Sequence, residues 1–165
     1  MVILEDMTEE QYAVYVERSV PQFAEESVKA GASKEGDAEA RSRNLFEQEL
    51  PNGIHTPNHH LYVIRDAETQ TTIGTTWLMI TERPERVSAF ICDIFIFSEW
   101  RSKGHGANTM RLLEIKAREQ FSATEIGLHV FCHNRSAQSF YSKVGYKPTG
   151  LYMKKFLNMS DQGDR

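Results

Sequence analysis

One stretch, residues 87–120, constrains the fold of this chain more than any other. Residues 87–97 are almost all apolar or aromatic, and a strand that is apolar on both faces belongs in the middle of a sheet, where both faces are covered. A turn containing Gly104 and Gly106 follows and leads into a helical pattern over residues 107–120. Backbone N–H groups at the start of such a helix attract anions. The stretch therefore predicts a central strand followed by a phosphate-binding turn.

The glycines of this turn match neither common nucleotide-binding pattern. The dinucleotide pattern requires a third glycine where Thr109 stands, and the mononucleotide pattern requires Lys and Ser or Thr at the helix start. The turn does match Arg/Gln-x-x-Gly-x-Gly/Ala, as Arg101-x-x-Gly104-x-Gly106. In these residues it resembles the acetyl-coenzyme A signature of the GNAT superfamily of N-acetyltransferases.

The composition favours one globular domain. With 165 residues, 40% of them hydrophobic, the chain can bury a sizeable core, and we expect one domain over residues 1–165 with a polar tail at 158–165. The net charge of -4 and the lack of a basic run argue against a nucleic-acid partner. No apolar run suggests a membrane span or a secretory leader. Cys92 and Cys132 are expected to be free thiols, which suits a cytoplasmic protein.

Hydrophobic periodicity and turn residues predict the remaining elements. Thr8 and Gln11 form a capping-box pattern that opens a first helix, which Pro21 is expected to kink or restart. The expected order is an edge strand, two helices, three antiparallel strands, a helix, a strand, a helix and a last strand. In chain order these elements span residues 2–4, 8–31, 37–50, 61–65, 72–80, 87–97, 107–120, 125–131, 134–145 and 149–156.

The order of these elements predicts an α/β (α+β) fold. The strand–helix–strand unit over residues 87–131 should be a right-handed crossover with parallel strands, whereas the strands before it pair antiparallel. The result is a mixed, largely antiparallel central sheet with helices on both faces. Ligands of such sheets bind outside the carboxyl ends of parallel strands, which here are residues 96–97 and 130–131.

A second motif lies at that edge of the expected sheet. A strand is followed by Asn134-x-x-Ala137, then by Tyr141 seven residues after the asparagine, and then by Gly145-Tyr146. This segment is also similar to GNAT proteins, and both motifs stand in the family's order and spacing. The resemblance covers residues 87–157 and implies a GNAT-like acyl-coenzyme A N-acyltransferase fold.

The resemblance also implies where acetyl-coenzyme A binds. In the family, backbone groups of the central strand pair with the pantetheine arm, which points to Ile94, Phe95 and Ile96. Asn134 would hydrogen-bond to the pantetheine, although capping a helix would explain this residue without a ligand. Arg101 holds the first place of the turn motif. The pyrophosphate would be held by the amides of Ser102, Lys103, Gly104, His105, Gly106 and Ala107.

Tyr141 occupies the family's position for the general acid. Transfer of an acetyl group to an amine releases a thiolate from coenzyme A. Thiols titrate near ~8.5 and tyrosine near ~10, so a nearby phenol can protonate the departing sulfur.

The sequence leaves three candidates for the general base. Some GNAT members carry a glutamate five residues before the asparagine, and this chain has His129 there; a neutral imidazole can act as a base near pH ~7. Asp93 is the other candidate, because a carboxylate among apolar strand residues is costly unless it is paired or functional. A chain of water molecules is a third route for the proton.

Two classes of function follow from the resemblance. The first is an enzyme that transfers acetyl from acetyl-coenzyme A to a primary amine by direct attack in a ternary complex. The second is a non-catalytic acyl-coenzyme A binding or sensing module, and retention of Tyr141 favours the enzyme. The acceptor would be a small-molecule amine or a protein or peptide amine, and a homodimer stays open as an assembly.

A histidine-rich loop raises the question of a metal. His55, His59 and His60 lie within six residues, but no second cluster supplies further ligands at a recognisable spacing. We therefore expect no metal. Neither cysteine has a basic partner at a recognisable spacing, so we do not expect a covalent acyl-enzyme either.

Overall fold

A single sheet organises the part of the chain that the structure, a computed structural model, describes, namely residues 1–155. Its strands lie side by side in chain order: β1 (Val2–Asp6), β2 (His59–Asp66), β3 (Thr72–Arg83), β4 (Arg86–Ile96) and β5 (Glu125–Leu128). All neighbours are antiparallel except β4 and β5, which are parallel. The predicted mixed, largely antiparallel sheet is confirmed.

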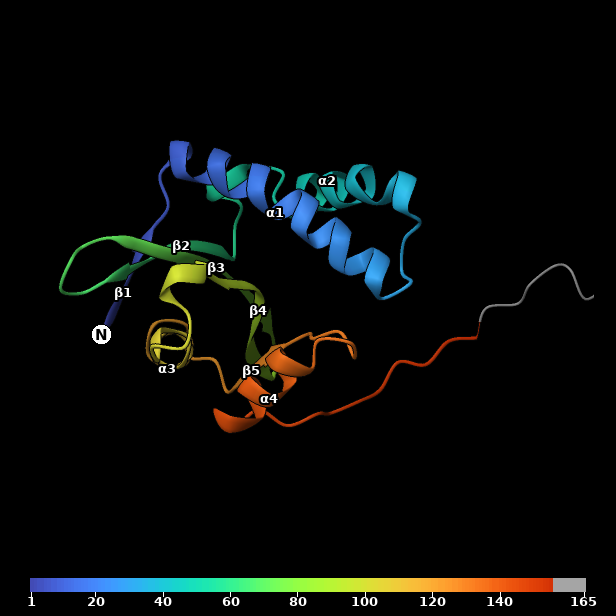
Figure 1. Ribbon diagram of the computed structural model, residues 1–165. Helices are drawn as coiled ribbons and strands as arrows, with labels where there is room; N and C mark the ends of the chain where they lie inside the picture. Colours follow the sequence, from blue (N-terminus) through green and yellow to red (C-terminus); the bar gives the residue numbers. More distant parts are fainter. Residues whose placement is uncertain (156–165) are drawn as a thin grey trace, which may run out of the picture.

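Helices cover both faces of this sheet (Figure 1). The first layer holds α1 (Glu9–Lys29) and α2 (Ala38–Glu49), and the opposite layer holds α3 (His105–Phe121) and α4 (Arg135–Lys143). Three short 3-10 turns connect elements: η1 (Glu35–Asp37), η2 (Gly53–His55) and η3 (Ser98–Trp100). None of the helices in this part of the chain is both long and apolar enough to cross a membrane.

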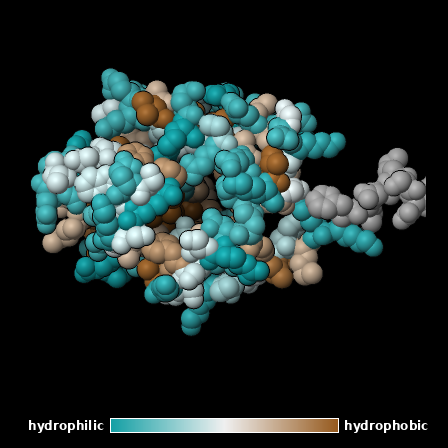
Figure 2. All heavy atoms as spheres, viewed as in Figure 1, coloured by the Kyte–Doolittle hydropathy of each residue, from teal (hydrophilic) through white to brown (hydrophobic). Residues whose placement is uncertain are grey.

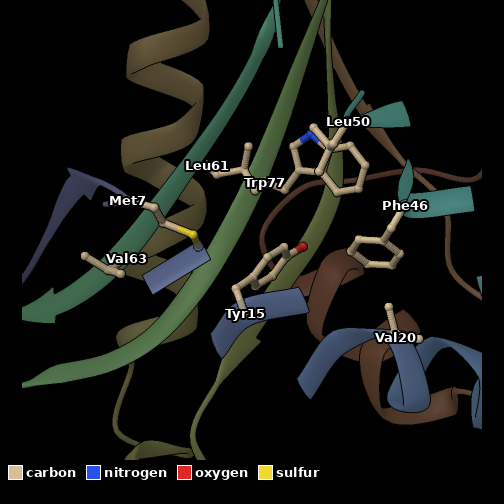
Figure 3. Packing of buried hydrophobic residues seen from close by; sticks show 8 residues of the cluster. All are labelled: Met7, Tyr15, Val20, Phe46, Leu50, Leu61, Val63 and Trp77. Carbon is tan, nitrogen blue, oxygen red and sulfur yellow. The ribbon is translucent and has the colours of Figure 1, made fainter. Parts of the chain in front are cut away.

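Alternation along the strands builds a separate core under each layer of helices. On β2, Leu61 and Val63 pack with α1 and α2, whereas Tyr62 between them packs with α3. Figure 3 shows the first of these cores, in which Tyr15 and Phe46 meet Trp77 of β3. The two cores pack on opposite faces of the sheet. Each buried β4 side chain therefore belongs to one core or the other.

The start of α1 is as the sequence predicts. Thr8 accepts a hydrogen bond from the Gln11 backbone, and the Gln11 side chain accepts one from the Thr8 backbone, which completes the capping box. The helix does not restart at Pro21 but continues through it to Lys29. Proline removes only one intrahelical hydrogen bond, and α1 has buried residues both before and after it.

An irregularity in β4 separates it from β5. Trp77 of β3 pairs with Asp93 and Leu78 pairs with Ile91, so Cys92 is an extra residue in β4, a β-bulge. The pairing of β4 with β5 ends at the same point, at Ile91 and Leu128. The strand expected over residues 125–131 is therefore shorter than predicted, because β5 has no partner beyond the bulge.

The strand predicted over residues 149–156 is wrong for the residues that the structure describes. Residues 149–155 form neither strand nor helix, and Leu151, Tyr152 and Met153 are exposed. Their apolar pattern suits a strand, but no neighbouring strand pairs with them. Residue 156 and the tail predicted at 158–165 lie outside the described residues.

Candidate active site

The divergence of β4 and β5 leaves one edge of β4 open. Beyond the bulge, Ile94, Phe95 and Ile96 pair with β3 on one side and with no described strand on the other. An open strand edge offers N–H and C=O groups to an extended ligand. The surface is hollowed near this point, between the layer of α1 and α2 and the layer of α3 and α4 (Figure 2). This edge can receive an amide-containing arm such as pantetheine.

The turn after β4 presents the amino end of α3. Ser102 and Gly104 both have positive φ, 60° and 84°, and Gly104 is the N-terminal cap of α3. The N–H groups at the start of a helix have no intrahelical partner, so those of His105, Gly106 and Ala107 are free to bind an anion. The geometry of this turn fits a pyrophosphate group.

Side chains hold this turn against the end of β4. Arg101 donates from Nε to the Ile96 carbonyl oxygen at 2.8 Å, and its guanidinium lies 5.1 Å from the Phe95 ring centroid. Lys103 lies over the Trp100 ring at 5.0 Å, and the buried His105 ring packs against the same indole. Arg101 therefore positions the turn in this structure.

Gly106 has a different role from Gly104. A Cβ atom at residue 106 would lie 3.2 Å from Cζ of Phe140, whereas a Cβ at residue 104 would meet nothing within 4 Å. Gly106 therefore permits α3 to approach α4, and Gly104 permits the positive φ of the turn.

Asn134 and Tyr141 come from the other side of the open edge. Asn134 caps α4, since its Oδ1 accepts from the Ala137 N–H at 3.0 Å; its Nδ2 donates to no described residue. Tyr141 is half-buried against Phe140 and Tyr146, at ring-centroid distances of 5.3 and 6.1 Å. Burial first, and then the charge of Asp93, raises the pKa of Tyr141. Its phenol is thus protonated at neutral pH and can donate.

Asp93 projects from the bulge toward α1. Its Oδ2 is buried and forms no hydrogen bond within the described residues, while 30% of its side chain remains exposed. Burial raises the pKa of this carboxyl, and the Arg18 guanidinium partly opposes that rise. A carboxylate in this state is a stronger base than an ordinary aspartate.

His129 does not join this group. It lies just beyond the end of β5, is exposed, and packs edge-on against Phe131 at 5.0 Å. No described side chain forms a hydrogen bond or ion pair with it. The structure thus brings Asp93 and Tyr141 close enough to interact electrostatically and shows no such link to His129.

Two residues beside Asp93 were missed by the sequence reasoning. Arg18 of α1 has its Nη2 4.0 Å from Asp93 Oδ2. The Tyr15 hydroxyl is buried without a hydrogen-bond partner, and its pKa is raised by burial and by the charge of Asp93. Both lie on one face of α1, three residues apart, but nothing in the sequence indicates that this face meets Asp93.

The histidine-rich loop directs its rings to separate partners. His55 lies 3.1 Å from Glu9, His59 accepts from the Trp77 indole at 2.9 Å, and His60 packs on Phe121. Within residues 1–155, no group of three His, Cys, Asp or Glu side chains could hold a metal ion. Burial raises the pKa of Cys92 to about 12, so this thiol is not a nucleophile at neutral pH.

A groove with a volume of about 290 Å³ lies beside α1, and Tyr15 and Arg18 are among the residues that line it. It is lined by α1, by β2 and β3, and by Phe97, and it contains neither Asp93 nor Tyr141. We therefore do not assign the reaction to it.

Together, the open edge of β4 and the turn before α3 form a candidate site for a ligand that carries an extended arm and an anionic group. The model of the acetyltransferase (GNAT) family matches residues 20–146, and the chain belongs to this family. The resemblance found in the two motifs is thus confirmed.

The chain also resembles two proteins of Bacillus subtilis (strain 168). It is 31% identical to the uncharacterized N-acetyltransferase YycN, over 94% of this chain and 99% of YycN. It is 33% identical to the uncharacterized N-acetyltransferase YdgE, over 93% of this chain and 97% of YdgE. The crystal structure of YycN matches with a TM-score of 0.89 over 96% of this chain and 99% of that one.

Proposed function

We propose that the protein transfers the acetyl group of acetyl-coenzyme A directly to a primary amine. The observation that carries this proposal is the open edge of β4, which leads from the anion-binding turn to Asp93 and Tyr141. When bound there, acetyl-coenzyme A supplies an activated thioester. The residues of the chain then have to bind it, orient the amine and move two protons.

Asp93 is the general base of this proposal. An alkylammonium near pKa ~10 cannot attack until it loses a proton, and the raised pKa of Asp93 suits it to accept that proton, directly or through a water molecule. The exposed part of its side chain leaves room for an acceptor. His129 is less suited, because it lies past the end of β5, packs edge-on against Phe131 and shows no electrostatic link to Tyr141.

Tyr141 is the general acid. As the C–N bond forms and the C–S bond breaks, its hydroxyl donates a proton to the departing sulfur. The phenolate that remains is reprotonated from solvent, because Tyr141 is only half-buried. The ammonium gives one proton to Asp93 before the attack and loses a second from nitrogen as the amide forms. The sulfur gains one proton, so each cycle releases one proton to solvent.

The binding roles follow the geometry of the site. Backbone groups of Ile94, Phe95 and Ile96 would pair with the pantetheine arm, and the amides of residues 102–107 would hold the pyrophosphate. Asn134 has a free Nδ2 for the same arm while its Oδ1 caps α4. We place the activity in the cytoplasm, where the exposed thiol of Cys132 would stay reduced.

A thiol-release assay tests this proposal. The protein is mixed with acetyl-coenzyme A and a panel of amines that includes polyamines, amino acids, aminoglycosides and peptides with free N-termini or lysines. Amine-dependent release of thiol, with the acetylated amine identified by mass spectrometry, is the expected result. Binding of acetyl-coenzyme A with no turnover on any amine would instead indicate an acyl-coenzyme A sensor.

A further inference from the structure

Arg18 is held in place by groups other than its ionic partner. Its Nη2 donates to Thr75 Oγ1 at 2.7 Å and to Ser19 Oγ at 3.1 Å. The guanidinium lies over the Phe95 ring at 4.4 Å, with Tyr15 and Phe97 at 5.4 and 5.8 Å. Hydroxyl and aromatic contacts, rather than Asp93, therefore hold this guanidinium in place.

This arrangement leaves the carboxylate of Asp93 available. A stabilising arginine–carboxylate pair is usually bidentate and saturates both oxygens. Here the closest approach is 4.0 Å, and Oδ2 of Asp93 accepts no hydrogen bond from any described residue. The positive charge is therefore close enough to favour the ionised carboxylate but does not occupy its lone pairs.

We infer that Arg18 is a positioning residue that keeps Asp93 ionised and free to accept the proton of the acceptor amine. This inference rests on the proposed function, because it assigns Arg18 a purpose in acetyl transfer. Arg18 itself touches neither reacting group and acts only through Asp93.

The other groups around Asp93 do not supply this charge. From α1, Tyr15 faces it as a neutral phenol, and from α4 Tyr141 does the same. On β4, the Cys92 thiol stays protonated because burial raises its pKa to about 12. Among the described groups that influence Asp93, Arg18 is thus the one cation. Removing it takes away the largest opposition to burial, and burial favours the protonated acid.

The test is a titration of the Asp93 carboxyl carbon by NMR in the full chain, with Asp93→Asn used to assign the signal. Arg18→Gln removes the charge but keeps a donor for Thr75, and Arg18→Lys keeps the charge. Arg43→Gln is the matched control, since Arg43 pairs with Glu17 and Glu39 at the surface of the helical layer. Arg18→Met serves as a second neutral variant if Arg18→Gln does not fold.

We expect the titration midpoint of Asp93 to move to higher pH in Arg18→Gln and to stay near that of the wild type in Arg18→Lys and Arg43→Gln. The pH at which kcat/KM falls on the acidic side should move by the same amount as this midpoint. At a pH below that point, kcat/KM should be about tenfold lower for each pH unit of the shift. An unchanged midpoint in a folded neutral variant would overturn the inference.

An unchanged midpoint can be told apart from a failure of the proposed function, because the NMR titration of Asp93 needs no enzyme turnover. A wild-type rate in Asp93→Asn would remove Asp93 from catalysis and, with it, the purpose assigned to Arg18. A shifted midpoint together with a shifted acidic limb supports both the inference and the proposed role of Asp93.

Discussion

Asp93 shows how one extra residue in a strand changes the surroundings of a side chain. Strict alternation would place Asp93 on the same face as Ile91, in the core under α3. The bulge at Cys92 turns it to the other face, toward Tyr15 and Arg18 of α1. A carboxylate that would otherwise be buried among apolar side chains thus meets a cation and a phenol of α1.

The first prediction concerns the pH dependence of Asp93. The basic form of a carboxyl exists above its pKa, and burial raises the pKa of Asp93 above the ordinary 3.8. We expect kcat/KM to fall as the pH falls through this raised value. Asp93→Asn should lower kcat about 10²- to 10⁴-fold and abolish that acidic limb. A pH–rate profile of both proteins checks this, and an identical profile would show that Asp93 is not the base.

Arg18 and Tyr15 could not be assigned from the sequence. Their spacing on α1 is that of an ordinary helix face, and Arg18 would be expected in solvent. Their contact with Asp93 depends on how α1 crosses β3 and β4 and on a bulge that no local pattern predicts. Asp93 itself could be singled out, because a charge inside an apolar strand is locally unusual.

At the scale of elements, the turn between β4 and α3 combines two glycines with different functions. Gly104 has a φ of 84°, which side chains with a Cβ rarely adopt. Gly106 lies against Phe140 of α4. The sequence predicted both glycines as part of a phosphate-binding turn, and the structure adds that Gly106 also packs against α4.

The second prediction separates these two roles. Gly104→Val forces a β-branched residue into the left-handed region at a cost of roughly 1–2 kcal/mol, and the turn should relax away from its anion-binding shape. We expect weaker binding of acetyl-coenzyme A by calorimetry, with the fold kept. Gly36→Val is the matched control, because Gly36 also has open space around it and lies away from the turn. Equal affinity of both variants would remove the turn from the site.

Elements with strong local signals were predicted well. The capping box of α1, the apolar β4 and the asparagine cap of α4 each depend on neighbouring residues, and all are present. Elements that need a distant partner were predicted less well. β5 ends three residues early because β4 diverges from it, and residues 149–155 have the pattern of a strand without a neighbour.

At the scale of the whole molecule, side chains join the two helical layers across the sheet. His133, in the turn before α4, lies 2.8 Å from Glu26 of α1, and Lys29 lies 3.2 Å from the same carboxylate. Lys154 donates to the Gly31 carbonyl oxygen at 2.6 Å, beyond the end of α1. The contacts of His133 and Lys154 thus tie the C-terminal part of the described chain to the end of α1.

The third prediction concerns the bridge between Glu26 and His133. Burial opposes ionisation of Glu26, but hydrogen bonds from His133 and Lys29 outweigh it and lower the pKa below 4.5. A lowered pKa stabilises the folded state above the unfolded value, and this stability is lost as the pH falls below about 4.5. Glu26→Gln should therefore lower the free energy of unfolding by about 1 kcal/mol or less at neutral pH, and by less in acid.

Denaturant unfolding at two pH values measures this effect. Glu25→Gln is the control, since Glu25 is more exposed and pairs with Lys29 within the same helix. If both variants lose the same free energy of unfolding, or if the loss in Glu26→Gln does not shrink in acid, the bridge between Glu26 and His133 does not stabilise the fold.

The central claim is that acetyl transfer takes place at the open edge of β4, with Tyr141 as the proton donor. Tyr141→Phe keeps the ring and its packing and removes only the hydroxyl. Tyr146→Phe is the matched control from the same aromatic cluster, because the buried Tyr146 hydroxyl has no hydrogen-bond partner among the described residues.

The most direct measurement is single-turnover acetyl transfer by the wild type and both variants, with the affinity for acetyl-coenzyme A measured in parallel. The account predicts a rate about 10²- to 10⁴-fold lower in Tyr141→Phe, with its affinity unchanged and Tyr146→Phe near the wild type. A wild-type rate in Tyr141→Phe would show that Tyr141 only packs the core and would contradict the proposed mechanism.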